Sequence, residues 1–427
     1  MTMKWIVLAL AVLMYALIVI FPNRKSYSSL GAALIMIILG VVSPKAALGE
    51  LINWNVLMIF VGSLVIAELF IYSRVPAVIA DSLVRCSPNV GIAIVAILIM
   101  TGIISAFVEN VATVLVMAPI ALALCTKLKL DPTYFMVGLA VMANLQGTAT
   151  LVGDPPSMIF ADQANYGFND FFFFQGKPSI FFAVQVGMLA GALFFYGFFA
   201  KQGGQKIELE REQILTLVPT VLLILMIGGL ATASFVYGGI SLASGLLVIM
   251  LGMVGLLWYW IIRKEGAGKA WSLIKELDWD TVLFLIGIFV VVGAVAAVGL
   301  LDDFAGLLSR IVGNNVFLGF FLILAVSTLI SGFVDNVPYI IVMLPVAAKL
   351  TVDLSLKPEL YMFALLIGSC MGGNLTPFGA AANVVSVGIL RKQGIGINFR
   401  QWLKISLPFT VLTITASAIF IWLVWRN

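Results

Sequence analysis

The chain has 427 residues, of which 62% are hydrophobic and 10% are charged, and its mean hydropathy is +1.14. Charged residues are too few to cover the surface of a water-soluble protein, so the composition indicates a chain that lies almost wholly in a bilayer. The net charge of +4 comes without a basic patch that would suggest nucleic acid, and histidine is absent, which excludes imidazole proton relays and histidine metal sites.

Apolar stretches of helical length follow one another along the whole chain. They are continuous rather than alternating, which favours α-helices over the strands of a membrane barrel. The first run, from Lys4 to Phe21, is longer than the apolar part of a usual secretory signal, so we expect it to be the first span. The sequence predicts an all-α polytopic membrane protein with stretches that begin near Trp5, Leu30, Leu51, Val90, Phe135, Phe181, Ile214, Ser241, Thr281, Phe317, Leu360 and Trp402.

An internal repeat is visible in the letters themselves. Residues 105–119, SAFVENVATVLVMAP, return as SGFVDNVPYIIVMLP at 331–345, an offset of 226 residues. The match extends upstream and downstream of these segments. It predicts a first repeat over 1–200 and a second over 214–427, joined by a polar cytoplasmic linker over 201–213.

The repeats are expected to have inverted topology. Each half should hold three spans, a paired apolar segment, a broken span and a final span, which is an odd number of crossings whether or not the pair spans fully. Most of the 24 basic residues fall in loops on the side opposite the N-terminus. The positive-inside rule then places both termini on the non-cytoplasmic side of the inner membrane.

Each paired segment carries one acid–asparagine pair in apolar surroundings, Glu109-Asn110 and Asp335-Asn336. A carboxylate in hydrocarbon is costly and indicates function by default. One reading makes each pair a solvated turn between two complete spans. The other reading makes them the buried tips of re-entrant hairpins near 109–113 and 335–339. We expect this reading because neither turn has the charged or glycine-rich residues seen at the other connections.

Two further spans are interrupted in the middle, at 144–157 and 370–383, by Gly, Pro, Thr and Asn. A broken helix exposes unpaired backbone groups that can hold ions or polar solutes. Asp154 precedes two prolines, so its carboxylate serves either as an ordinary helix cap or as a coupling acid. Glu68 is either a proton-path residue or a snorkelling side chain, and Cys370 is most simply a small apolar filler.

These motifs define the candidate site. The proton- or ion-coupling residues are Glu109, Asp154 and Asp335. Any one of the polar neutral residues could serve only interhelical hydrogen bonds, but their clustering favours a common site. The expected solute-binding residues are Asn110, Thr113, Asn144, Gly147, Thr148, Thr150, Asn336, Asn374, Thr376 and Asn383.

The predicted interior holds no Lys, Arg or His, which favours a neutral polar solute or a cation over a polyanion. Buried carboxylates can exchange a proton for the transported species. No nucleophile–base pair, phosphate loop or metal motif is present, and the three cysteines lack ligand spacing, so we expect no enzymatic activity, cofactor or metal. A non-transporting membrane receptor is the remaining alternative, which the duplicated broken helices disfavour.

The segments ENVATVLVMAP, DNVPYIIVMLP, GTATLVGDPPSMI and GNLTPFGAAANVV resemble the ion transporter superfamily of ArsB-type arsenite permeases, P proteins, NhaD sodium/proton antiporters, silicon effluxers and divalent-anion/sodium symporters. The resemblance covers nearly the whole chain. It implies re-entrant hairpins, two discontinuous helices, a scaffold with a mobile transport domain and elevator-like alternating access. Ser157 departs from the Asn usual in the arsenite-permease and P-protein branch, and Glu109-Asn110-Val111 departs from the Ser-Asn-Thr tips of the symporters.

The resemblance leads to an expected function. The chain should export an arsenite- or antimonite-like metalloid hydroxide in exchange for protons; the alternatives are sodium/proton antiport and transport of silicic acid or a carboxylate. The expected partners are a small inorganic solute, protons or sodium, and lipid. A homodimer and an associated soluble ATPase subunit both stay open.

Overall fold

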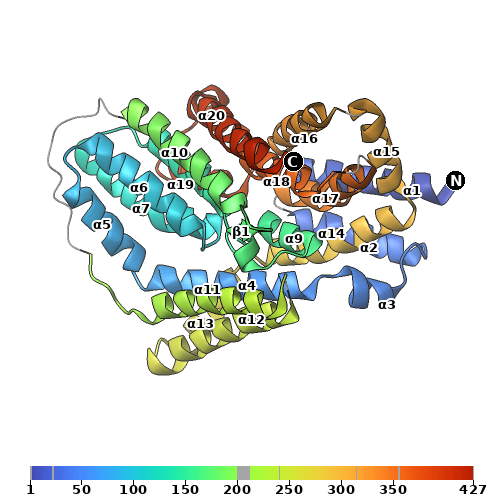
Figure 1. The fold of residues 1–427 in the computed structure, drawn as a ribbon. Helices are drawn as coiled ribbons and strands as arrows, with labels where there is room; N and C mark the ends of the chain where they lie inside the picture. Colours follow the sequence, from blue (N-terminus) through green and yellow to red (C-terminus); the bar gives the residue numbers. More distant parts are fainter. Residues whose placement is uncertain are drawn as a thin grey trace.

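The computed structural model describes residues 2–21, 24–199, 212–239, 241–313, 315–353 and 356–426, and these are almost wholly α-helical (Figure 1). The prediction of an all-α fold is therefore confirmed. Most of the expected linker, residues 201–211, lies outside the described residues. A short antiparallel hairpin, β1 (Phe173–Phe174) with β2 (Lys177–Pro178), is a feature that the apolar pattern did not predict.

The described part of the first half contains ten α-helices, six of which begin within five residues of a predicted position. The ten are α1 (Thr2–Ile20), α2 (Lys25–Ile38), α3 (Pro44–Ala46), α4 (Trp54–Tyr72), α5 (Val75–Cys86), α6 (Val90–Ser105), α7 (Asn110–Leu128), α8 (Thr133–Gly147), α9 (Pro155–Ala164) and α10 (Ile180–Phe199), with irregular turns η2 (Ala47–Leu51) and η3 (Phe168–Phe171).

The second half repeats this order. It contains α11 (Val218–Tyr237), α12 (Leu242–Leu257), η4 (Trp258–Ile262), α13 (Ala267–Glu276), α14 (Trp279–Ala297), α15 (Leu300–Val312), α16 (Val316–Ser331), α17 (Asn336–Asp353), α18 (Glu359–Gly372), η5 (Gly373–Leu375), α19 (Ala381–Lys392) and α20 (Phe399–Trp425).

The helix starts reproduce the sequence repeat. Helices α6, α7, α8 and α9 each begin 226 residues before α16, α17, α18 and α19, and α4 begins 225 residues before α14. The two sets have opposite direction: Leu51, just ahead of α4, packs on Gly293 near the end of α14. The start of one helix therefore lies beside the end of its counterpart, as inverted repeats require.

Eight helices among the described residues are long and apolar enough to cross a membrane. They are α1, α4, α7, α10, α11, α12 with η4, α14 and α20. Helices α2, α6, α16 and α17 are apolar but shorter. The amphipathic helices α5, α13 and α15 did not appear among the predicted stretches, because charged residues interrupt them.

Two groups of helices pack around the centre. In the first, called here the scaffold group, α4 packs on α12 and α2 packs on α14. Gly62 and Gly287 allow these close approaches, since a Cβ at Gly62 would stand 2.6 Å from the carbonyl oxygen of Val248 and one at Gly287 would stand 2.5 Å from the carbonyl carbon of Ser29. In the second, called the hairpin group, α6–α7 pack on α8, α16–α17 pack on α18, and α10 packs on α20. In Figure 1, α4, α11 and α12 run along the lower edge, with α6, α7 and α10 above them.

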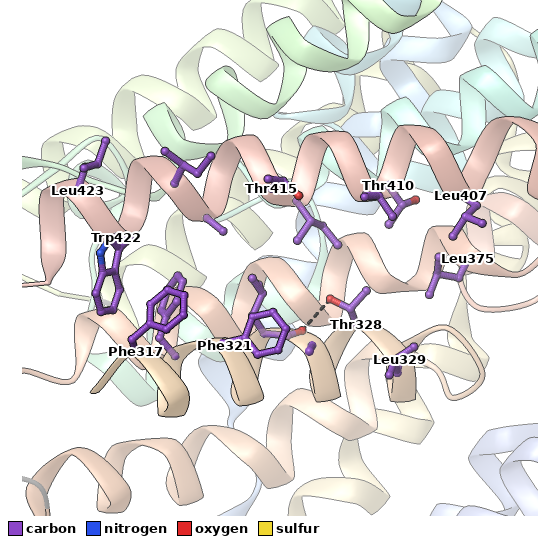
Figure 2. A pocket seen from close by; sticks show the side chains of 17 residues that line it. Phe317, Phe321, Thr328, Leu329, Leu375, Leu407, Thr410, Thr415, Trp422 and Leu423 are labelled. Carbon is purple, nitrogen blue, oxygen red and sulfur yellow. Dashed lines mark hydrogen bonds between the residues drawn. The ribbon is translucent and has the colours of Figure 1, made fainter. Parts of the chain in front are cut away.

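The repeat is imperfect at the outer face of the hairpin group. Helix α10 packs on α6, whereas their counterparts α20 and α16 flank an apolar groove of about 520 Å³ (Figure 2). Phe317, Phe321 and Leu423 on its walls are more than half exposed, as expected of side chains that face lipid. Thr328 turns its hydroxyl back to the carbonyl of Leu324, at 2.7 Å. The hydroxyl of Thr328 is therefore not available to a molecule in the groove. The groove also lies apart from the polar centre.

Candidate transport site

The two hairpin turns and the two helix breaks meet at one small polar cavity of about 30 Å³. Glu109 and Asn110 reach it from the first turn, and Asn336 reaches it from the second; all three are at most 9% exposed. The first turn therefore lies inside the protein, whereas the second is partly exposed, with the side chain of Asp335 25% and Phe333 57% exposed. Its lining residues are Lys25, Phe60, Glu109, Asn110, Asn144, Asp154, Pro155, Asp278, Thr281, Asp335, Asn336, Val337 and Ala380 to Ala382.

Each hairpin turn ends in a carboxylate that caps the following helix. Glu109 is the N-cap of α7, and its Oε2 accepts a hydrogen bond from the backbone N–H of Ala112 at 3.0 Å. Oδ1 of Asp335 accepts one from the N–H of Val337 at 3.1 Å. A carboxylate at a helix N-terminus is stabilised by unpaired N–H groups and by the helix dipole, which accounts locally for an acid at this depth.

The helix breaks are tied to the hairpins by the same two contacts in each half. Thr150 donates its hydroxyl hydrogen bond to the carbonyl of Ala106, and Thr376 donates to that of Gly332 at 2.6 Å. Thr150 and Thr376, and likewise Ala106 and Gly332, are counterparts at the 226-residue offset. Each hairpin and its neighbouring break are thereby held as one unit.

Glycines allow the breaks to fold back on themselves. A Cβ at Gly153 would stand 2.5 Å from the carbonyl oxygen of Gly147, and one at Gly379 would stand 2.6 Å from that of Gly373. Larger residues at these two positions would push the backbone apart. The glycine pattern noted in the sequence thus has a steric cause.

Asp154 occupies the N-cap position of α9, but its side chain makes no capping hydrogen bond. Its Oδ2 instead accepts from Nδ2 of Asn336 at 3.3 Å, across the boundary between the two halves. Of the two readings left open by the sequence, ordinary capping by the carboxylate is not the geometry found. The residue is 7% exposed and faces the cavity.

Three asparagines join the two breaks. Nδ2 of Asn144 donates to Oδ1 of Asn374 and to Oδ1 of Asn383, both at 2.8 Å. Asn383 in turn donates to the carbonyls of Gly373 and Thr376 at 2.9 and 2.8 Å. Of the three, only Asn144 also lines the cavity, so Asn374 and Asn383 serve as interhelical hydrogen-bonding residues in this conformation.

The remaining expected solute-binding residues lie behind the cavity wall. Thr113 donates to the carbonyl of Val108 at 3.2 Å, and Thr148 donates to that of Asn144 at 3.3 Å. Gly147 accepts a hydrogen bond from Ser157 at 3.4 Å. Ser157 is the counterpart of Asn383, and it reaches only this one carbonyl, whereas Asn383 reaches two.

The expectation of an interior without a basic residue is wrong. Lys25 lines the cavity, and its Nζ donates to Oδ2 of Asp335 at 3.1 Å while lying 5.3 Å from the ring centroid of Phe284. The apolar run begins only at Leu30, so hydropathy alone places Lys25 in the preceding loop. Helix α2 begins at Lys25, so the lysine is carried into its first turn beside the hairpin. The absence of basic residues, which favoured a neutral solute or a cation over a polyanion, therefore does not hold.

Sequence reasoning also missed Asp278 and Thr281. Asp278 is the N-cap of α14, where Oδ1 accepts from the N–H of Thr281 at 3.0 Å and Oδ2 accepts from its hydroxyl at 2.5 Å. The spacing of Asp and Thr at the start of an apolar run is a capping signal that could have placed the residue, though not its proximity to the site.

Two other residues singled out in the sequence do not line this cavity. Cys370 is fully buried in α18, and Glu68 is half-buried on α4. Within the described ranges no three His, Cys, Asp or Glu side chains form a group that could hold a metal ion.

Comparison with known proteins agrees with a membrane transporter. The sequence profile of CitMHS, described as a citrate transporter family, matches residues 15–368. The uncharacterized transporter Rv2684 of Mycobacterium tuberculosis is 31% identical over 98% of both chains. The human P protein is 23% identical over 95% of this chain, which covers 58% of that longer protein.

Two solved transporters share the fold. The YdaH transporter of Alcanivorax borkumensis, described as having an unusual topology, superposes with a TM-score of 0.59 at 14% identity, covering 99% of this chain and 98% of that one. MtrF of Neisseria gonorrhoeae, described as one of a class of antimetabolite efflux pumps, gives 0.57 at 16%, covering 92% of this chain and 84% of that one. The superfamily resemblance drawn from the hairpin and break motifs is confirmed. Since the family profile spans most of its length, this chain belongs to the CitMHS citrate transporter family, and it is a multi-pass membrane transporter.

Proposed function

We propose that this transporter exports a small metalloid hydroxide, such as arsenite or antimonite, in exchange for protons. The observation that carries the proposal is the cavity of about 30 Å³ between the hairpin turns, with Glu109, Asp154 and Asp335 in its walls. Three carboxylates at one polar centre inside a bilayer protein are the usual mark of a proton or ion pathway.

Size and charge both favour a compact solute. A cavity of this volume has room for roughly one or two water molecules, so a tricarboxylate would need the hairpins to separate much further than a small hydroxide would. Four acids line the cavity, including Asp278, against the single lysine. An uncharged solute avoids repulsion by the acids, and amides such as Asn110 and Asn336 offer it both donors and acceptors.

Alternating access would come from movement between the two helix groups. The threonine contacts tie each break to its hairpin, so the hairpin group is suited to move as one body against the scaffold group. In this proposal the protein lies in the inner membrane with both termini on the non-cytoplasmic side, and protons return through the same cavity that carries the solute outward.

A second candidate substrate is a carboxylate. Lys25 is a cation in the cavity that could pair with an anionic group once Asp335 releases it, and the family is described by citrate transport. This function would use the same hairpins but with the solute charge neutralised by the lysine.

The test is a flux screen in everted vesicles with arsenite, antimonite, silicic acid, sodium and citrate, each followed by proton movement. We expect arsenite or antimonite to drive proton release from vesicles that hold the wild-type protein, and Glu109→Gln and Asp154→Asn to abolish it. Glu276→Gln, an exposed acid on α13, is the matched control and should behave as wild type. Proton movement with citrate or sodium alone would replace the metalloid assignment by that solute.

A further inference from the structure

The proposed exchange assigns no role to the ion pair between Lys25 and Asp335. Lys25 belongs to α2 of the scaffold group, and Asp335 belongs to the turn before α17 of the hairpin group. Their 3.1 Å contact therefore bridges the two bodies whose relative movement the proposed function requires. The side chains are 13% and 25% exposed, so the pair is largely shielded from water.

Among the other ion pairs of the described residues, Arg85–Asp81 is also shielded but lies within helix α5, and the pairs that join different helices are more exposed. Lys4 and Asp303 meet at 2.5 Å with side chains 31% and 64% exposed, and Lys349 pairs with an aspartate that is 60% exposed. Solvent and salt screen such pairs, so they separate at little cost. A pair inside the protein is costly to break if either charge is left without a partner.

The charged groups that face Lys25 define what happens when the pair separates. On α14, Asp278 and Asp280 lie on its scaffold side, while Asp335 faces it from the hairpin. Glu109 and Asp154 line the same cavity. The lysine therefore keeps a counter-charge on its own body, whereas Asp335, once moved away, would carry an uncompensated negative charge.

The first hairpin turn has no such pair in the described residues. Gly62 and Gly287 are counterparts, and they contact Val248 of α12 and Ser29 of α2, so these two residues are counterparts as well. Lys25 precedes Ser29 by four residues, and the residue that precedes Val248 by four is Ser244. Glu109, the counterpart of Asp335, accepts its hydrogen bond from the backbone of its own hairpin. The bridging ion pair is thus found at the second hairpin turn and not at the first.

We propose that Lys25 is a tethered cation that occupies the Asp335 carboxylate whenever no proton or transported cation does, and so holds the unloaded hairpin group against the scaffold. A proton that binds Oδ2 of Asp335 forms the neutral acid, the ammonium of Lys25 loses this partner and stays with Asp278 and Asp280, and the hairpin group is released. Lys25 is in this sense a coupling residue. This inference rests on the proposed proton exchange, and its test is arranged so that the two can fail separately.

The first measurement is the decay of an imposed pH gradient in proteoliposomes without added solute. Vesicles that hold wild-type protein should keep the gradient, Lys25→Gln should dissipate it roughly tenfold faster, and Lys25→Arg should restore retention. Asp335→Asn removes the same pair from the other side and replaces Lys25→Gln in the labelling measurement below if Lys25→Gln fails to fold. Lys4→Gln, which removes an exposed pair, is the control and should retain the gradient.

The second measurement does not depend on transport. Ile341 on α17 is 1% exposed and lines a cleft against Phe289 and Gly293 of α14, so it reports separation of the two groups. An Ile341→Cys probe with the exposed Cys86 replaced by serine should react with a membrane-impermeant maleimide several-fold faster when Lys25→Gln is added, and no faster with Lys4→Gln. An unchanged rate overturns the tethered cation whatever the fluxes are. If labelling is faster in Lys25→Gln but no solute drives proton movement in the wild type, the proposed proton exchange is overturned and the role of Lys25 as a tethered cation is retained.

Discussion

The two halves of this transporter share their backbone contacts but differ in charge. Each break is tied to its hairpin by a threonine, Thr150 or Thr376, and each folds back on a glycine, Gly153 or Gly379. On the scaffold side the halves diverge. Asn53 caps α4 through Val56, whereas the counterpart that caps α14 is the acid Asp278.

The difference separates what the fold requires from what the chemistry requires. Any side-chain oxygen can cap a helix, so Asn and Asp serve equally for the fold. Only Asp brings a charge, and in the second half that charge lies beside Lys25 and Asp335. At these two equivalent caps the duplicated fold therefore has a neutral residue in the first half and, beside the shared cavity, a charged one in the second.

The largest expected effect comes from exchanging the acids at the two hairpin turns separately. Glu109→Gln should abolish proton-coupled flux while keeping the fold, because the amide oxygen can still accept from Ala112 but cannot bind and release a proton. Asp335→Asn should instead allow flux that is no longer coupled to protons. The measurement is solute and proton flux in the same vesicles, and identical behaviour of the two variants would remove the functional difference between the halves.

A second prediction concerns the shared backbone. Gly153→Ala and Gly379→Ala should each lower the free energy of unfolding by about 1–3 kcal/mol, because the added methyl overlaps a carbonyl oxygen in the same way in both breaks. Thermal unfolding in detergent measures this. Gly388→Ala, where a Cβ would meet nothing within 4 Å, is the control and should change little. A large effect in one break only would show that the two are not equivalent.

A third prediction exchanges one residue for its counterpart. Asn383→Ser, which copies Ser157 into the second half, removes the donors to Gly373 and Thr376 and the acceptor for Asn144. Because these buried groups lose partners, we expect a destabilisation of about 1–3 kcal/mol in thermal unfolding. Transport should fall less than in Glu109→Gln, since Asn383 does not line the cavity; an equal loss would place Asn383 in solute binding.

The sequence predicted the helical fold and the inverted duplication because both depend on apolar length and on a repeat that is read directly from the letters. It also predicted that the two turns meet, since neither has the charged or glycine-rich residues of the other loops, and Glu109 and Asp335 do line one cavity, although Asp335 is 25% exposed. It could not predict Lys25 at that centre. Hydropathy marks where an apolar run begins, and a helix that starts five residues earlier, at a lysine, is invisible to it.

The amide network shows a related limit. The sequence grouped Asn144, Asn374 and Asn383 with the solute-binding residues by type, but only packing decides which amide faces a cavity and which faces another amide. Thr113 and Thr148 turn back to backbone carbonyls for the same reason. Whether a threonine hydroxyl donates to a nearby backbone carbonyl or to a solute depends on the local helix geometry, which the residue type alone does not show.

The smallest expected effect lies outside the membrane spans, where the second half has α13 and the first half has only the short α3. Glu265, just before α13, accepts hydrogen bonds from Lys269 at 2.7 Å and from Tyr72 at 2.6 Å, and the lysine bond is the main cause that holds the pKa of Glu265 below its ordinary value of 4.5. A lowered pKa means that the ionised form is favoured in the folded protein, so this stabilisation is complete above pH 4.5 and disappears as the pH falls through the lowered pKa. Glu265→Gln should therefore lower the thermal unfolding temperature slightly at pH 7, with a difference from wild type that shrinks in high salt and vanishes in strong acid. A difference that persists at low pH would mean that Glu265 acts through packing rather than through charge.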